Sequence, residues 1–253
     1  MKIKMKFTMI KSISLLGLII IALSCFTGAA TAKSDWLEKA KGMIENIRKS
    51  DTLSADEISS GLKEALLVGT DTVVKQLGQS DGFNKDPKVH IPIPENLKSV
   101  RSALKKVGMS SYVDDLELRL NRAAEKATPE AKKLFHNAIK KMTLDDARSI
   151  YKGPDDAATR YFKSKMSKPL AKAMYPIVDK SLTEVGAVRS YDKLIGKYRS
   201  LPFVPDVKTD LTKHVIKKGM NGIFYYLARE EAAIRRNPVK RTTELLKRVF
   251  GSR

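Results

Sequence analysis

Apolar side chains recur at steps of three and four residues along most of this chain, and that spacing limits the fold more than any other feature. Near the start, the residues that would share one helical face are Trp36, Ala40, Met43 and Ile47. Steps of this size match the 3.6-residue period of an α-helix and not the two-residue period of a strand. We therefore predict an all-α protein built as a single compact multi-helix domain.

Capping residues, glycines and prolines divide the chain into about ten predicted helices. The expected segments are 36–47, 54–77 after a capping box at Ser54, 95–107, 112–127, a helix starting at Pro129 with Thr128 as cap, short helices at Asp145-Asp146 and Asp155-Asp156, 169–185, 191–198, 211–236 and 242–250. Pro176 should kink or break its helix, and Gly219 and Gly222 suggest a close helix–helix approach. Residues 88–94 contain two prolines, so we expect an extended connector or a short edge strand.

The first 32 residues have the order of a secretory signal peptide. Lys2, Lys4, Lys6 and Lys11 precede an apolar run at 13–23, and small residues follow up to Ala30-Thr31-Ala32. The apolar run is about half the roughly 20 residues that a membrane-spanning helix needs. We therefore predict a cleaved signal peptide at 1–32, a single all-helical domain at 33–253, and export to the periplasm of a bacterial cell.

Cys25 opens an alternative to cleavage after Ala32, because cleavage before a cysteine would leave a lipid anchor on the envelope. Ser24 suits the position before a lipidated cysteine, but Leu23 and Ala22 are swapped relative to the usual lipoprotein pattern. Cys25 is the only cysteine of the chain. A mature chain beginning at Lys33 would have neither a disulfide nor a thiolate zinc site.

The charge is strongly positive, with a formal net charge of +20 that falls to +16 without the four lysines of the signal segment. A basic surface favours anionic partners such as lipid head groups and envelope polymers. Nucleic acid ranks lower, because an exported protein rarely meets it. The plainer alternative is that the excess of lysine only keeps the protein soluble.

Seven polar residues are candidates for a pocket or a polar network: Asn121, Arg122, Glu125, Asp155, Asp156, Glu230 and Glu231. Each group also has a structural interpretation, as a buried hydrogen-bond network, as caps of a first helical turn, or as a solvated helix face. The sequence contains no His-x-x-x-His pair and no glycine-rich phosphate loop, and the string Gly78-Gln79-Ser80-Asp81-Gly82 follows a predicted helix instead of the strand that a Gly-x-Ser-x-Gly nucleophile elbow needs. We therefore predict no catalytic residue, no cofactor and no metal.

The end of the chain is a candidate surface for an anionic partner. Its basic residues are Arg235, Arg236, Lys240, Arg241, Lys247 and Arg248, and its apolar stripe is Leu245, Leu246, Val249 and Phe250. A basic amphipathic helix of this kind can lie on an anionic membrane. The alternative is that the stripe packs on the core, since a helix of about nine residues is unstable alone.

Several short strings together resemble one bacterial exported family, catalogued as domain of unknown function 4197. They are Gly61 to Leu66, Asp81-Gly82-Phe83, Ile91 to Pro94, Asn121 to Glu125, Asp155 to Thr159, Tyr161-Phe162, Asn237-Pro238 and Arg241-Thr242-Thr243. The resemblance covers about 53–251. It implies a helical protein of the Gram-negative envelope, and it brings no known activity, substrate or catalytic residue.

These observations favour a non-enzymatic binding or structural module whose basic surface meets an anionic or hydrophobic envelope partner. The alternative is a periplasmic enzyme of the hydrolase kind, which would use the polar Asn, Asp and Glu candidates. An enzyme should gather those residues in one concave pocket, whereas a binding module should spread them as caps and ion pairs.

Export gives the first testable prediction. Mass spectrometry of the protein purified from its native cells should find Lys33 as the first residue, or a lipid-modified Cys25. A full-length chain beginning at Met1 in the cytosol would contradict the prediction.

Overall fold

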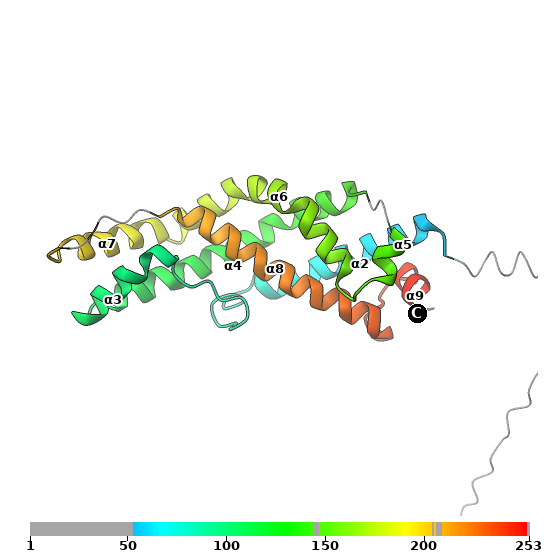
Figure 1. The fold of residues 1–253 in the computed structure, drawn as a ribbon, viewed down its shortest axis with the longest axis horizontal. Helices are drawn as coiled ribbons and strands as arrows, with labels where there is room; N and C mark the ends of the chain where they lie inside the picture. The colour runs from blue at the N-terminus through cyan, green and yellow to red at the C-terminus, as the bar shows by residue number, and fades with distance from the viewer. Residues whose placement is uncertain (1–52, 144–146, 204, 206–208, 252–253) are drawn as a thin grey trace, which may run out of the picture. The chain divides into compact units, whose positions relative to one another are not determined.

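The computed structural model of the chain describes residues 53–143, 147–203, 205 and 209–251. These residues form eight α-helices and two 3-10 helices, and none of them lies in a strand (Figure 1). The predicted all-α class is confirmed. The predicted signal peptide, Cys25, the helix at 36–47 and Asp145-Asp146 lie outside the described residues.

Helix α2 (Ala55–Leu77) begins at the capping box that the sequence predicted. Ser54 Oγ accepts a hydrogen bond from Glu57 N at 3.1 Å, and the Glu57 carboxylate accepts one from Ser54 N at 2.9 Å. The reciprocal bonds satisfy two backbone donors that a bare helix end leaves unpaired. The start of α2 is therefore set locally, before any tertiary contact is made.

The remaining helices follow in chain order. They are η1 (Glu95–Leu97), α3 (Lys98–Lys106), α4 (Ser111–Lys141), α5 (Ala147–Lys152), α6 (Ala157–Glu184), α7 (Ala187–Arg199), α8 (Leu211–Arg236), η2 (Pro238–Lys240) and α9 (Glu244–Gly251). The bounds of α8 are those predicted from its apolar spacing and from Asn237-Pro238. None of the described helices combines the length and the apolar character that crossing a membrane requires.

Two helices run through prolines that the sequence treated as boundaries. The prediction of a new helix at Pro129 is wrong, because α4 continues through it, and Thr128 Oγ1 donates to the Ala124 carbonyl at 2.7 Å. Likewise α6 starts at Ala157 and includes both Pro169 and Pro176. An interior proline costs about 3 kcal/mol of helix stability. Burial of the apolar faces on both sides offsets that cost.

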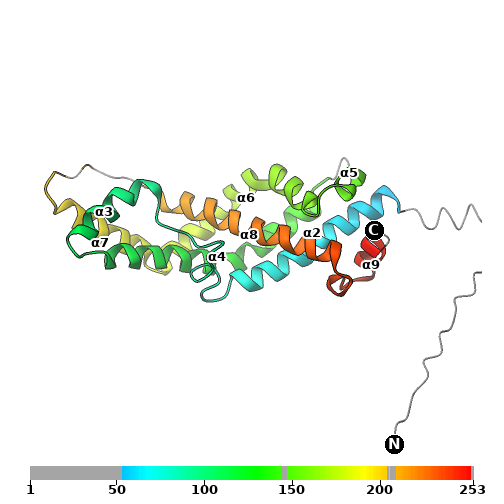
Figure 2. The same cartoon turned by 60° about the horizontal axis from the view of Figure 1, so that its bottom comes forward.

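Helices α4, α6 and α8 share the centre of the core. Helix α8 packs against α2, α4 and α6, while α4 also contacts α7, and α7 contacts α3 (Figures 1 and 2). The rings of Phe135, Phe162 and Phe224, one from each of the three central helices, lie 5.8 to 6.2 Å apart between centroids. Aromatic rings at this spacing attract one another beyond the area they bury.

Close backbone approaches depend on glycines of α2 more than on the two predicted in α8. A Cβ on Gly61 would lie 2.6 Å from Val249 Cγ2 of α9, and one on Gly69 would lie 2.9 Å from Leu227 Cδ1 of α8. The expectation for Gly219 is wrong, since a Cβ there would meet nothing within 4 Å. Gly222 does make a close approach, but to Phe83 and Val89 of the connection after α2 instead of to a helix.

Substituting Gly61→Ala should lower the free energy of unfolding by about 1–3 kcal/mol, because the new methyl group overlaps Val249. The added substitution Val249→Ala should recover part of the lost stability, because it removes the methyl groups that the new side chain overlaps. Gly196→Ala is the control, because its Cβ meets nothing within 4 Å on an exposed turn of α7, and it should stabilise by up to about 1 kcal/mol. Chemical denaturation measures all three, and equal effects at Gly61 and Gly196 would contradict the packing argument.

Candidate functional site

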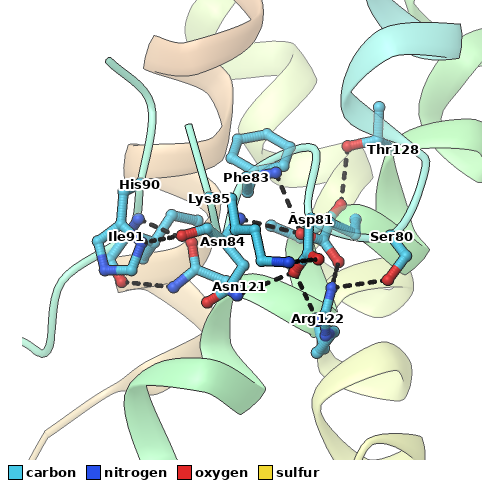
Figure 3. A network of polar contacts seen from close by, with 12 residues as sticks. Ser80, Asp81, Phe83, Asn84, Lys85, His90, Ile91, Asn121, Arg122 and Thr128 are labelled. Atoms are coloured by element: carbon cyan, nitrogen blue, oxygen red, sulfur yellow. Dashed lines mark hydrogen bonds and ion pairs between the residues drawn. The ribbon is translucent and has the colours of Figure 1, made fainter. Parts of the chain in front are cut away.

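The polar face of α4 binds residues 78–94, the connecting segment between α2 and η1 (Figure 3). The amide oxygen of Asn121 accepts a hydrogen bond from Ile91 N, and its amide nitrogen donates one to the Ile91 carbonyl, both at 2.8 Å. Asn121 thus pairs both backbone groups of an extended residue, as a neighbouring strand would. Residues 88–94 therefore lie in no strand: 88 and 89 belong to a turn closed by hydrogen bonds to the Asp86 carbonyl, and Asn121 pairs with the irregular stretch that follows.

Glu125 lies one turn further along α4 and holds the same connecting segment. One carboxylate oxygen accepts hydrogen bonds from Phe83 N at 3.1 Å and from Asn84 N at 3.0 Å, and the other accepts one from Arg122 at 2.7 Å. Glu125 is only 4% exposed. The structure therefore places Asn121, Arg122 and Glu125 in an internal network that fixes a loop to a helix.

Arg122 extends the network towards the surface. Its guanidinium donates to Asp81 Oδ1 at 2.7 Å and to Ser80 Oγ at 3.0 Å. Hydrogen bonds from Lys85, Asn84 and Arg122 hold the pKa of Asp81 well below its usual value. Asp81 has a positive φ of 68°, a backbone region that disfavours most side chains, so these contacts hold it in an uncommon conformation.

Two histidines hold the far end of the connecting segment. His90 lies between the Asn84 carbonyl, 2.9 Å from Nδ1, and the Glu117 carboxylate, 3.0 Å from Nε2. His214 of α8 has its Nε2 at 2.8 Å from the Pro92 carbonyl and donates to it. Burial lowers the pKa of His214, which favours its neutral form. Both histidines therefore serve the packing of the segment.

At the start of α6, Glu231 of α8 plays the same part that Glu125 of α4 plays at the connecting segment. Its carboxylate accepts hydrogen bonds from Ala158 N at 3.0 Å, from Thr159 N at 2.7 Å and from Thr159 Oγ1 at 2.6 Å. Arg235 completes the pair at 2.8 Å, and both side chains are fully buried. A carboxylate of α8 thus caps the first turn of α6, where exposed amides and the helix dipole favour a negative charge.

The predicted capping role of Asp156 is wrong. Asp156 is the N-cap residue of α6 but makes no side-chain bond to the first turn, and it pairs with Arg160 at 2.8 Å instead. Asp155 forms an ion pair with Arg236, and Glu230 lies 3.4 Å from Lys240. Neighbouring residues on a helix point in different directions, which is why Glu230 does not join the buried pair of Glu231.

Six of the seven polar candidates fall into two groups, and Glu230 pairs with Lys240 apart from both. Asn121, Arg122 and Glu125 face the connecting segment, whereas Glu231 faces the start of α6, with Asp155 and Asp156 nearby in the chain. Within the described residues, no three His, Cys, Asp or Glu side chains come together in a way that could hold a metal ion.

The basic residues near the chain end are already engaged with other groups. Arg235 also donates to the Tyr151 carbonyl at 2.9 Å, and Arg241 donates to the carbonyls of Ile234 and Arg235. The remaining ion pairs here are Lys247 with Glu244 at 2.6 Å and Arg248 with Glu57 at 2.8 Å. The apolar stripe packs on the core, since Leu246, Val249 and Phe250 are fully buried.

A groove between α6 and α8 is the site that sequence reasoning missed. Its volume is about 540 Å³, within the range typical of ligand pockets. Its lining residues are Ser167, Lys168, Ala171, Lys172, Tyr175, Lys213, Ile216, Lys217, Met220, Asn221 and Phe224. Ile216, Met220 and Phe224 are buried, while the four lysines are exposed around them. The groove therefore combines an apolar floor with a basic rim, and it contains none of the seven polar candidates.

Three of the four lysines that line the groove have no acidic partner. Lys213 pairs with Asp210 at 3.0 Å. Within the described part of the chain, the side chains of Lys168, Lys172 and Lys217 have no hydrogen bond or ion pair. Lys168 and Lys172, like Lys213 and Lys217, stand four residues apart on one helix, where like charges repel. The sequence does contain a pattern that indicates this groove, because two of its helices each carry a pair of lysines four residues apart beside apolar positions. Only the fold shows that the two helices are neighbours.

The family model described as "Protein of unknown function (DUF4197)" matches residues 52–251. The match confirms the resemblance seen in the sequence and spans the described helices. No curated protein and no solved structure matches the chain significantly.

The buried pair gives a prediction that separates the two cap candidates of α6. Glu231→Gln should lower the free energy of unfolding by about 3–5 kcal/mol, because it leaves Arg235 buried without its counter-charge. Asp156→Ala removes only an exposed ion pair and should change the free energy of unfolding by less than about 1 kcal/mol. Chemical denaturation of both variants measures the difference. A larger loss for Asp156→Ala than for Glu231→Gln would return the cap to Asp156.

Proposed function

Because the chain belongs to the DUF4197 family of proteins of unknown function, we propose its role from its own geometry: a non-enzymatic binding module exported to the bacterial envelope. The binding face in this proposal is the groove between α6 and α8. Its partner is a component of the envelope that is both anionic and hydrophobic. Export rests on the order of residues 1–32, and the groove supplies the chemistry.

One observation carries the proposal: an apolar groove surrounded by four lysines, three of them without an acidic partner. Like charges gathered without compensation cost stability, and an anionic partner would remove that cost. The apolar floor adds a hydrophobic contribution that a purely electrostatic surface lacks. A partner with a negative group next to an apolar part fits both features.

The residues near the chain end rank behind the groove as a partner surface. Arg235 is buried with Glu231, and the exposed basic residues there already have carboxylate or carbonyl partners. A new anion would have to displace those partners, which reduces the net gain from binding it. The chain end is therefore a control for the groove, because it has a similar charge in a different state of pairing.

The rival enzyme hypothesis has less support from the geometry. A general acid or base must reach its substrate, but Glu125 and Glu231 are buried and bound to backbone amides of the protein itself. Asn121 is occupied in the same way by Ile91. The polar residues that line the groove are its four lysines, Ser167, Tyr175 and Asn221, and no carboxylate is among the described residues that line it.

Two variants of equal charge test the proposal. Replacing Lys168, Lys172, Lys213 and Lys217 by glutamine should weaken co-sedimentation with vesicles containing phosphatidylglycerol by roughly tenfold or more. Replacing Lys240, Arg241, Lys247 and Arg248 by glutamine should change it much less, although the net charge falls by the same amount. Binding of the wild-type protein to these vesicles should weaken as the salt concentration is raised. Vesicles of phosphatidylcholine alone should bind the protein poorly.

Circular dichroism should show the same helical content for both variants and the wild type. Equal losses in the two variants would mean that total charge, and not the groove, determines binding. Loss only in the chain-end variant would move the binding face to that end.

A further inference from the structure

We infer that the groove between α6 and α8 binds a single-chain amphiphile, with its acyl chain along the floor and its anionic head among the lysines. The inference rests on the proposed function and names the class of ligand. The shared chemistry of the head is a negative charge, carried by either a carboxylate or a phosphate. Three features of the groove lead to it: the shape of the floor, the placement of the rim, and the bend of α6.

The floor is one apolar strip instead of a wide cavity. Ile216, Met220 and Phe224 stand four residues apart along α8, and Ala171 faces them from α6. Such a strip spans about 12 Å of helix. An extended hydrocarbon chain laid along α8 would contact these three side chains in turn, with Ala171 of α6 beside it. A line of three apolar side chains fits one extended acyl chain.

The floor is fixed at one end and adaptable in the middle. Phe224 also belongs to the cluster with Phe135 and Phe162, so its ring is held from behind by the core. Met220 is an unbranched thioether that can adjust to the shape of a ligand. Ala171 is small, which leaves room above the strip. These features suit a flexible chain that has no fixed polar groups along its length.

The rim places positive charge on both walls. Lys168 and Lys172 stand on α6, and Lys213 and Lys217 stand on α8. Lysine side chains lay their apolar stems along such a strip while their ammonium groups stay in water. An anionic head at the groove mouth can therefore be approached from both helices while the chain remains below it. Lys213 alone already has a carboxylate partner, Asp210, which raises its pKa.

The bend of α6 leaves space for the groove. Pro169 and Pro176 lie inside α6, and the groove residues of this helix fall at 167–175, around and between them. Each proline removes a backbone hydrogen bond and bends a helix. Figure 1 shows α6 changing direction along its length, next to the straighter α8. The separation that admits a ligand is therefore built into the backbone.

Isothermal titration of the full protein with matched amphiphiles tests the inference. Octanoate, decanoate and dodecanoate, all below their micelle concentrations, should bind about two- to fourfold more tightly for each added methylene until the strip is filled. Decanol, which has the same chain and no charge, should bind at least tenfold more weakly than decanoate. Decyl phosphate has the same chain length with a phosphate head, and whichever of decanoate and decyl phosphate has the higher affinity identifies the preferred head group.

Two tryptophan variants separate the groove from the rest of the surface. Ala171→Trp fills the space above the strip and should weaken decanoate binding at least tenfold. Ala173→Trp, two residues along the same helix on an exposed position outside the groove, should leave it unchanged. The quadruple glutamine variant of the groove lysines should bind decanoate no better than decanol. Thermal melting of each variant in the absence of ligand confirms that it folds.

The outcomes distinguish this inference from the proposed function. If affinity does not depend on chain length and Ala171→Trp has no effect, the inference is overturned, even where the lysine variant still loses vesicle binding. If the lysine variant retains vesicle binding as well, the proposed function fails with it. Equal weakening by Ala171→Trp and Ala173→Trp would place the acyl chain outside the groove and would also overturn the inference.

Discussion

Two buried glutamates carry the tertiary structure of this protein. An ionised carboxylate taken out of water costs several kcal/mol unless its oxygens find strong partners. Glu125 and Glu231 meet that requirement in the same way, each with two consecutive backbone amides from another segment and one arginine from its own helix. Glu125 thereby fixes the connection after α2, and Glu231 fixes the start of α6. The positions of the neighbouring helices depend on these two attachments.

The same requirement decides which polar residues are left for function. Residues that the sequence offers as candidates for a polar pocket, such as Asn121 and Glu231, form hydrogen bonds with backbone groups of the protein itself. Basic residues near the chain end are likewise neutralised, Arg235 most completely. Among the described lysines that remain without an acidic partner, Lys168, Lys172 and Lys217 gather around the groove between α6 and α8. Under the proposed function, the binding face is this apolar groove with its lysines, and not the segment where polar residues are densest.

The groove also depends on a departure from ideal helix geometry. Phe162, near the start of α6, packs on Phe224 of α8, whereas the groove lies between the two helices around Pro169 and Pro176. Pro169 and Pro176 weaken the backbone ladder of α6 where the groove lies, and the cost is offset by burial of Leu170, Met174 and Val178 on its other face. The prolines at which the sequence predicted a helix start and a kink or break therefore lie where the groove runs between α6 and α8.

Local physics in the sequence determined the class of fold and many of its boundaries. The apolar spacing predicted α8 over its whole length, and the capping box placed the start of α2, because both depend on residues within a few positions of each other. Tertiary structure alone decided that α4 passes through Pro129, that Glu231 instead of Asp156 caps α6, and that the lysines of α6 and α8 share one groove. Each of these outcomes is a balance between a local cost and a contact made by residues dozens of positions away. A single sequence records the local cost, but the distant partner becomes known only when the chain is folded.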